Sequence, residues 1–86
     1  MKKIFKYQVE KMTQRFFKLP EGAKFLHGGV QGGIPCAWFL VDEDNDLESR
    51  SFEVLGAGHE ITNNNLEYLF TWQEPPFVWH LFEVTA

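Results

Sequence analysis

Apolar and polar residues alternate along much of the chain, and a period of two is the pattern of half-buried β-strands. In the first such stretch, Phe5, Tyr7 and Val9 are separated by Lys6 and Gln8. No window shows the apolar spacing of an amphipathic helix, and Gly, Pro, Asn and Asp interrupt the apolar stretches at short intervals. The pattern therefore predicts strands at residues 3–9, 15–19, 23–31, 34–41, 50–55, 66–73 and 77–84.

The middle of the chain holds the most apolar of these stretches. Residues 36–41 are apolar at every position, which predicts a central strand that is covered on both faces. Pro35 stands before it and cannot donate to a neighbouring strand, so it belongs at a strand start or on an edge. Gly32 and Gly33 predict a tight hairpin with positive φ at both central residues. Seven strand candidates without a linker or repeat predict a single all-β domain over residues 1–86, either an antiparallel barrel or a two-sheet sandwich of about six to seven short strands.

The aromatic content is larger than a core of this size needs. The chain has nine Phe, three Trp and two Tyr in 86 residues. A domain this small buries only about 60% of the surface of its unfolded chain, and a buried aromatic ring removes roughly 150–250 Å² from water. We therefore expect an adequate core and some rings left at the surface, where they can form an interface with another protein.

Charge and cysteine content exclude several classes of function. Twelve acidic and eight basic side chains give a net charge of −4, which repels the phosphates of nucleic acid, so a nucleic-acid partner is not expected. The single cysteine permits no intramolecular disulfide. No signal-peptide pattern is found, and no stretch approaches the roughly 20 apolar residues of a membrane helix. We expect a cytoplasmic protein that does not contact membranes.

Candidate catalytic and metal-ligating residues are scattered along the sequence. His27, His59, His80 and Cys36 could build a metal-dependent enzyme, but their wide separations match no known ligand spacing, so no metal or other cofactor is expected. Cys36 lies in the apolar stretch, where a thiol is shielded and unreactive. The Gly-Ala-Gly-His sequence at 56–59 lacks the helix that a phosphate-binding turn needs, and predicts a glycine corner where His59 bonds to the loop backbone. No catalytic residue is assigned, and the histidine-based enzyme stays an alternative.

Three aromatic residues beside the Glu-Pro-Pro corner at 74–76 form the first candidate binding site. Trp72, Phe77 and Trp79 either belong to the core, as the alternation along 77–82 allows, or form an exposed patch for a partner protein. An alternative uses tryptophan rings to stack a nucleotide base and an arginine to hold its phosphate. The residues available for such a ligand site are Trp38, Trp72, Trp79, Arg15, Arg50 and His59.

A second candidate binding site is the acidic loop expected at residues 42–49. It carries five carboxylates and no basic residue before Arg50. The carboxylates belong to Asp42, Glu43, Asp44, Asp46 and Glu48. Like charges this close are costly, so a loop that served only as a connector would be shorter or mixed in sign. We expect Asp42, Asp44 and Asp46 to contact a basic partner surface.

A series of motifs runs through nearly the whole chain: KYQV at 6–9, LPEGAKFL at 19–26, GIPCAWFLVD at 33–42, FEVLGAGHEI at 52–61, LEY at 66–68, TWQ at 71–73 and VWHLFE at 78–83. In this order they resemble a family of small uncharacterised proteins found mainly in bacteriophages and prophages. The resemblance implies a viral accessory protein with no assigned activity, so no catalytic residue is carried over. It also implies a protein that binds and blocks a host component, as small accessory proteins of this kind commonly do.

Together these observations predict a non-catalytic binding protein that acts on a host protein in the cytoplasm of the host cell. It is expected to work as a small homo-oligomer, a dimer in the simplest case, because exposed strand edges allow two copies to continue one sheet. The nucleotide-binding protein and the metal-dependent enzyme are the alternatives.

Overall fold

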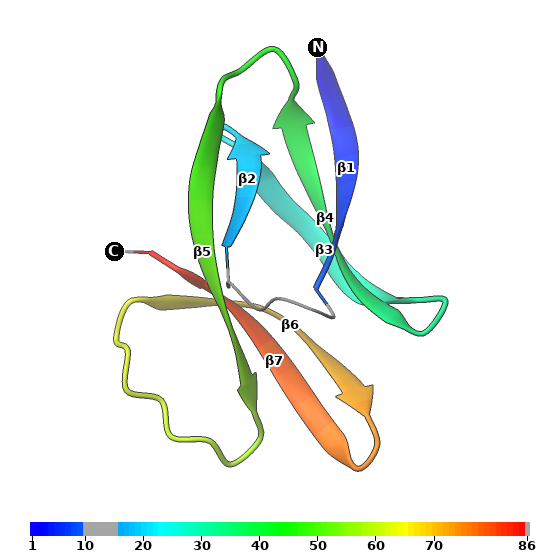
Figure 1. Ribbon diagram of the computed structural model, residues 1–86, viewed down its shortest axis with the longest axis vertical. Coiled ribbons are helices and arrows are strands. Elements are labelled where there is room, and N and C mark those ends of the chain that lie inside the picture. The colour runs from blue at the N-terminus through cyan, green and yellow to red at the C-terminus, as the bar shows by residue number, and fades with distance from the viewer. Residues whose placement is uncertain (10–15, 86) are drawn as a thin grey trace.

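The computed structural model describes residues 1–9 and 16–85 of the chain, without the side chain of Phe16. Within these residues the chain forms seven strands and no helix, arranged in two antiparallel sheets (Figure 1). The strands are β1 (Lys2–Gln8), β2 (Phe16–Pro20), β3 (Lys24–Gln31), β4 (Ile34–Asp42), β5 (Leu47–Gly56), β6 (Leu66–Glu74) and β7 (Phe77–Val84). The expected all-β class is confirmed, and the described part of the chain holds no helix able to cross a membrane.

The strands divide into one sheet with the order β1-β4-β3 and one with the order β2-β5-β7-β6. The sheets do not close into a barrel but pack as a small sandwich, the second of the two expected architectures. β4 is the central strand of its sheet and Pro35 lies near its start, as predicted. The turn between β3 and β4 has φ of +58° at Gly32 and +81° at Gly33, so the hairpin prediction is also confirmed.

The start of β5 differs from the prediction because strand pairing extends past the apolar residues. Leu47 and Glu48 pair with the end of β2, so β5 begins at Leu47 and the acidic loop is confined to residues 43–46. Arg15, which was expected to open the second strand, lies outside the described residues.

The core lies between the sheets and is centred on Phe39 of β4. Phe39 is fully buried, and its ring contacts those of Tyr7, Phe25 and Phe52 edge-on, at centroid distances of 5.8, 5.6 and 6.2 Å. Phe52 belongs to the second sheet, so this cluster joins the two layers. The buried hydrophobic residues packed together in the core are Val9, Leu19, Ala23, Ala37, Phe39, Val41, Phe52, Phe70, Trp72 and Leu81.

The two faces of β4 are not equally covered, which corrects the prediction for this strand. Ala37, Phe39 and Val41 point to the other sheet and are buried. On the opposite face Cys36 is buried too, whereas Trp38 and Leu40 are half-buried. β4 is therefore central within its sheet, but among the described strands a second layer covers only one of its faces.

The two sheets also meet where β6 lies against β3. The ring of Phe70 packs on the backbone of Gly28, because a Cβ atom at Gly28 would lie 2.0 Å from Phe70 Cγ, far inside contact distance. At Gly29, the next residue, a Cβ atom would lie 3.4 Å from its nearest neighbour, Nε2 of His27. Glycine is therefore required at position 28 by the packing of the sheets, but not at position 29.

A partly buried ion pair links β5 to β7. Arg50 Nε and Nη2 donate to the two carboxylate oxygens of Glu83 at 2.6 and 2.7 Å, and only 17% and 14% of the two side chains are exposed. Arg50 Nη1 donates to the carbonyl oxygen of Ala23, and the guanidinium carbon lies 5.6 Å from the centre of the Phe39 ring. The hydrogen bonds to Glu83 raise the pKa of Arg50. Arg50 thus ties together β5, β7 and the turn before β3.

Replacing Gly28 by Ala should destabilise the fold, because the new methyl group would overlap the Phe70 ring. Overpacking of this kind typically costs about 1–3 kcal/mol of unfolding free energy. Gly29→Ala is the matched control, since it adds the same methyl group to the neighbouring residue and should change stability by less than about 1 kcal/mol. Urea denaturation measures both variants, and equal stabilities would show that Phe70 does not pack on Gly28.

Replacing Glu83 by Gln should lower the free energy of unfolding by about 2 kcal/mol, since Arg50 would lose its carboxylate while staying largely buried. Glu74→Gln removes an exposed carboxylate from the neighbouring strand and should change this free energy by less than about 0.5 kcal/mol. Urea unfolding at neutral pH compares the two variants. If they behave alike, the ion pair contributes nothing to stability.

Candidate functional site

The inner face of β7 becomes more exposed toward the turn that joins it to β6. Leu81 is fully buried, Trp79 is half-buried and Phe77 is 56% exposed, although the three side chains point to the same side of the strand. Figure 1 shows the β6–β7 turn at the lower end of the molecule, beyond the strands of the β1-β4-β3 sheet. The first sheet therefore covers β7 near Leu81 and leaves its beginning uncovered.

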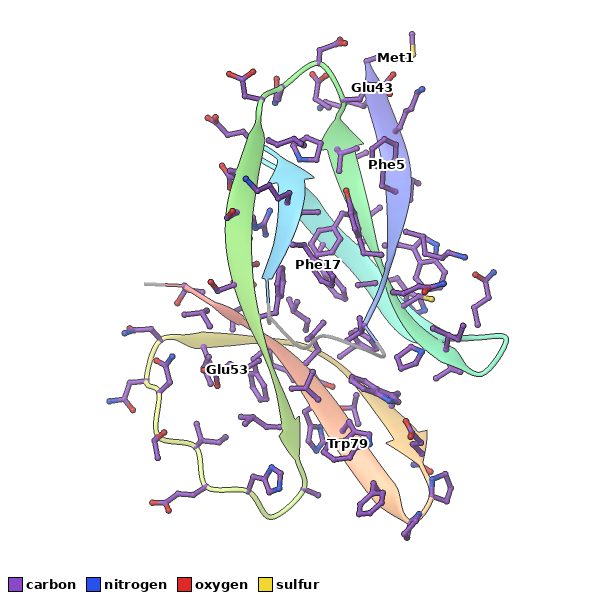
Figure 2. All side chains as sticks on the ribbon, viewed as in Figure 1. Met1, Phe5, Phe17, Glu43, Glu53 and Trp79 are labelled. Carbon is purple, nitrogen blue, oxygen red and sulfur yellow. The ribbon has the colours of Figure 1, made fainter. Side chains whose placement is uncertain are left out.

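Phe77, Trp79 and His59 form an aromatic cluster at this position, which we call the aromatic end. The ring centres of Phe77 and Trp79 lie 5.5 Å apart, and those of His59 and Trp79 lie 6.4 Å apart. Figure 2 marks Trp79 on the lower part of β7. A depression of about 280 Å³ lies beside the three rings and is also lined by Gly56, Ala57, Pro76 and Val78.

The turn after β5 holds His59 against Trp79. His59 N–H donates to the Gly56 carbonyl at 3.0 Å, and Gly58 has φ of +87°, which glycine adopts without strain. His59 Nδ1 accepts a hydrogen bond from Gly56 N–H at 3.0 Å, so the expected contact with the loop backbone is confirmed. A neutral His59 therefore carries its proton on Nε2 and has no free lone pair for a metal ion.

Of the three aromatic residues expected to bind a partner, Trp72 belongs to the core. Its side chain is buried and packs on Phe70, with 5.4 Å between the ring centres. Its indole Nε1 is buried and has no hydrogen-bond partner among the described residues. Trp72 is the strand partner of Trp79 and so supports the aromatic end from β6. Phe77 and Trp79 are the two residues that a partner can reach.

The opposite face of the β6–β7 hairpin carries a hydrogen-bonded chain that the sequence analysis missed. Tyr68 Oη lies 2.6 Å from Thr71 Oγ1, which lies 2.7 Å from His80 Nδ1. Thr71 and His80 are strand partners, so the contact follows from the register of the hairpin. Alternation along the two strands could have placed the side chains on this face, but it could not have paired them. No carboxylate joins His80 among the described hydrogen bonds, so the chain lacks the third group that orients a catalytic base.

The residues considered for a metal site are brought together only in part, because His59 and His80 line one depression whereas His27 and Cys36 lie in the other sheet. His27 lies on β3 in one sheet, whereas His80 lies on β7 in the other and His59 in the turn after β5. Cys36 is buried in β4, where its Sγ–H donates to a carbonyl of the same strand at 3.3 Å. In the part of the chain that the structure describes, no group of three or more His, Cys, Asp or Glu could hold a metal ion.

The residues considered for a nucleotide site are separated as well. Trp38 lies on the outer face of β4, whereas Trp72 and Trp79 lie on β6 and β7 of the other sheet. Each nitrogen of the Arg50 guanidinium already donates a hydrogen bond within the fold. Arg15 lies outside the described residues. The described members of this set therefore form no common pocket, and Arg50 is a structural residue.

The acidic loop is partly neutralised by basic groups from the beginning of the chain. Lys3 Nζ lies 2.8 Å from the Glu43 carboxylate, and the Met1 amine lies 3.0 Å from Asp42 and 2.6 Å from Asp44. The hydrogen bond from the Met1 amine holds the pKa of Asp42 below its usual value. These basic groups reach the loop because β1 pairs with β4, a contact that the local sequence does not reveal.

The acidic loop and the aromatic end lie at opposite ends of the molecule, as Glu43 and Trp79 show in Figure 2. The longest dimension of the molecule is 40 Å, so one small contact surface cannot include both. The Asp46 carbonyl accepts a hydrogen bond from Glu21 N–H at 2.8 Å, which ties the loop to the turn between β2 and β3. Contact of the loop with a basic partner stays a prediction. The loop would offer this partner less uncompensated negative charge than the sequence suggested.

Comparison with known proteins adds a family but no activity. Neither the curated proteins nor the solved structures give a match. A family model described as Domain of unknown function (DUF7352) matches residues 1–86. The protein therefore belongs to the DUF7352 family.

Proposed function

We propose that the protein is a non-catalytic binding protein, of the accessory kind that phages and prophages encode, and that it binds a host protein through the aromatic end. The observation that carries this proposal is the exposure of Phe77 beside half-buried Trp79, on a strand face that is fully buried at Leu81. Aromatic residues of this kind are enriched at the centres of protein interfaces and supply much of their binding energy.

The aromatic end suits a protein partner better than a small ligand. Its depression, at about 280 Å³, lies at the lower limit of the roughly 300–1,000 Å³ of typical small-molecule sites. The ring of His59 and the indole N–H of Trp79 are the polar side-chain groups of its lining, and Nδ1 of His59 is already bonded to Gly56 N–H, so few polar groups remain to orient a nucleotide. An apolar side chain of a partner protein, placed over Trp79, would remove the exposed rings from water.

The other candidate groups are engaged in the fold, which favours binding over catalysis. Arg50 is held by Glu83, Cys36 is buried, and His80 Nδ1 is hydrogen-bonded to Thr71. A catalytic site needs a nucleophile or base close to its orienting group at a place where substrate can enter. Arg50 and Cys36 are thus held within the fold. His80 lines a depression together with His59, but its described hydrogen bond goes to Thr71 and no carboxylate orients it.

Replacing Phe77 by Ser should abolish partner capture without unfolding the protein, because Phe77 is mostly exposed. Immobilised wild-type protein, incubated with a lysate of the host cell, should retain a protein that the Phe77→Ser variant does not retain. Calorimetry with the purified partner should show an affinity loss of at least about tenfold.

Leu47→Ser is the matched control for this experiment, since Leu47 is similarly exposed but lies at the other end of β5, beside the acidic loop. It should capture the partner as the wild type does. Equal capture by the Phe77→Ser and Leu47→Ser variants, each with an unchanged Tm, would exclude the aromatic end as the binding surface.

We also propose that the protein forms a homo-oligomer, a dimer in the simplest case. Like charges on the Lys2, Lys3 and Lys6 side chains oppose the pairing of two copies along β1. The outer face of the β6–β7 hairpin is better suited, because exposed Tyr68 lies there beside half-buried Phe82, with 5.6 Å between the ring centres. Contact between two such faces would bury these rings.

Light scattering after size exclusion should give twice the chain mass of 10.1 kDa for the wild-type protein. Tyr68→Glu should reduce the mass to that of one chain, because it places a charge in the proposed contact, and Phe77→Ser should leave it unchanged. A wild-type protein that is monomeric at high concentration would contradict the oligomer.

A further inference from the structure

β1 is an edge strand whose outer side pairs with no other described strand. It pairs with β4 along one side only, and Figure 1 shows it at the margin of its sheet. Two hydrogen bonds fix which of its residues face β4. Val9 N–H donates to the Pro35 carbonyl at 2.8 Å, and Glu43 N–H donates to the Met1 carbonyl at 3.2 Å.

These two bonds determine the direction of the remaining backbone groups of β1. In an antiparallel pair, residues that exchange hydrogen bonds with the partner strand alternate with residues whose N–H and C=O point away. Met1 and Val9 both bond toward β4, so every second residue between them does the same. Lys2, Ile4 and Lys6 therefore direct their backbone N–H and C=O groups to the open edge, where an added strand would need them.

The side chains of the same three residues lie on the outer face of the sheet. Phe5 and Tyr7, the residues between and beside them, pack against the core instead. Ile4 is 62% exposed, and exposed Lys2 and Lys6 flank it along the strand. The edge thus presents a cation, an aliphatic side chain and a second cation, each beside open backbone groups.

The positive charge of this edge is largely unpaired in the described part of the chain. Lys6 Nζ donates to the uncharged side chain of Gln31 at 2.7 Å and has no carboxylate within ion-pair distance there. Asp42, the strand partner of Lys2, bonds to the Met1 amine. Such an edge repels a second copy of itself and attracts a segment of opposite charge.

We propose that the β1 edge binds an extended acidic segment of a partner protein, which joins the sheet as a further strand. The backbone of this segment pairs with Lys2, Ile4 and Lys6, and its side chains on the outer face follow the order acid, apolar, acid. The acids lie beside the two lysines and the apolar side chain lies beside Ile4, because neighbouring strands place side chains in register.

A protein segment fits this edge better than single-stranded nucleic acid does. Nucleic acid has no strand backbone to pair with the open N–H and C=O groups, and it makes no use of Ile4. The edge belongs to the β1-β4-β3 sheet and the aromatic end to the other sheet, so this inference does not rest on the function proposed above.

A fluorescent peptide of sequence Ser-Glu-Thr-Leu-Thr-Glu-Ser carries the required pattern and serves as the probe. Fluorescence anisotropy at low salt should show saturable binding to the wild-type protein, weakened at least about tenfold by Lys6→Glu. Lys18→Glu is the matched control, since Lys18 is exposed on β2 of the other sheet and the net charge changes equally. It should change the affinity by no more than about twofold, because Lys18 alternates with Phe17 and Leu19 of the core and so carries its screened charge on the outer face of the other sheet.

The charge is then exchanged between protein and peptide. A peptide with one glutamate replaced by lysine should restore binding to the Lys6→Glu variant, and the position of the effective replacement gives the direction of the added strand. The Phe77→Ser variant should bind the original peptide as the wild type does, which separates this site from the aromatic end. Absence of peptide binding, or equal weakening by Lys6→Glu and Lys18→Glu, would overturn the proposal.

Hydrogen exchange tests whether the backbone pairs. On peptide binding the amides of Lys2, Ile4 and Lys6 should become protected, whereas the Phe5 amide, which faces β4, is protected already. Ile4→Pro removes one outward donor and should weaken binding, whereas Ile4→Val keeps the donor and should not. Peptide binding without new protection at these amides, or tighter binding of oligothymidylate than of the peptide, would show that the edge does not accept a strand.

Discussion

The ring of Phe70 lies against the backbone of Gly28, and this contact fixes how the two sheets meet. β6 can lie against β3 only because no side chain projects from position 28. With that approach in place, Phe39 reaches Phe52 across the interface, and Arg50 reaches from β5 both to β7 and to the turn before β3. Folded domains are stable by only about 5–15 kcal/mol in total, so each of these contacts is a large share of the stability of so small a protein.

The same arrangement determines which aromatic rings stay at the surface. The β6–β7 hairpin continues past the region that the first sheet covers, so the inner face of β7 changes from core at Leu81 to surface at Phe77. Full burial of a Phe side chain stabilises a fold by roughly 1.5–3 kcal/mol. Because Phe77 is mostly exposed in the isolated chain, it contributes only part of this free energy to folding. The aromatic end is therefore a piece of core-like surface that no second layer of the described strands covers, and this free energy would become available to a partner that covered it.

How much of this the sequence predicts depends on whether a feature is local. Alternation with a period of two is local, and it gave the all-β class, the approximate strands and the hairpin at Gly32 and Gly33. The start of β5 was missed because Leu47 and Glu48 are strand residues only through their pairing with β2. The sites depend on contacts between residues that are distant in the sequence. Alternation places Phe77 on the core side of β7 but does not say where the other sheet ends. It also cannot show that Arg50 meets a carboxylate from another strand.

Distant contacts also decide which charges the protein offers to a partner. Alternation along β1 sends Lys3 toward the acidic loop, where it meets Glu43, and sends Lys6 to the outer face, where no described carboxylate meets it. An exposed pair such as Lys3–Glu43 contributes little to stability, but it lowers the net charge of the loop. The loop that looks most charged in the sequence is thus partly compensated, while the open β1 edge keeps its charge. Electrostatic attraction therefore favours an acidic partner at the β1 edge as well as a basic partner at the loop, whereas the sequence alone suggested only the second.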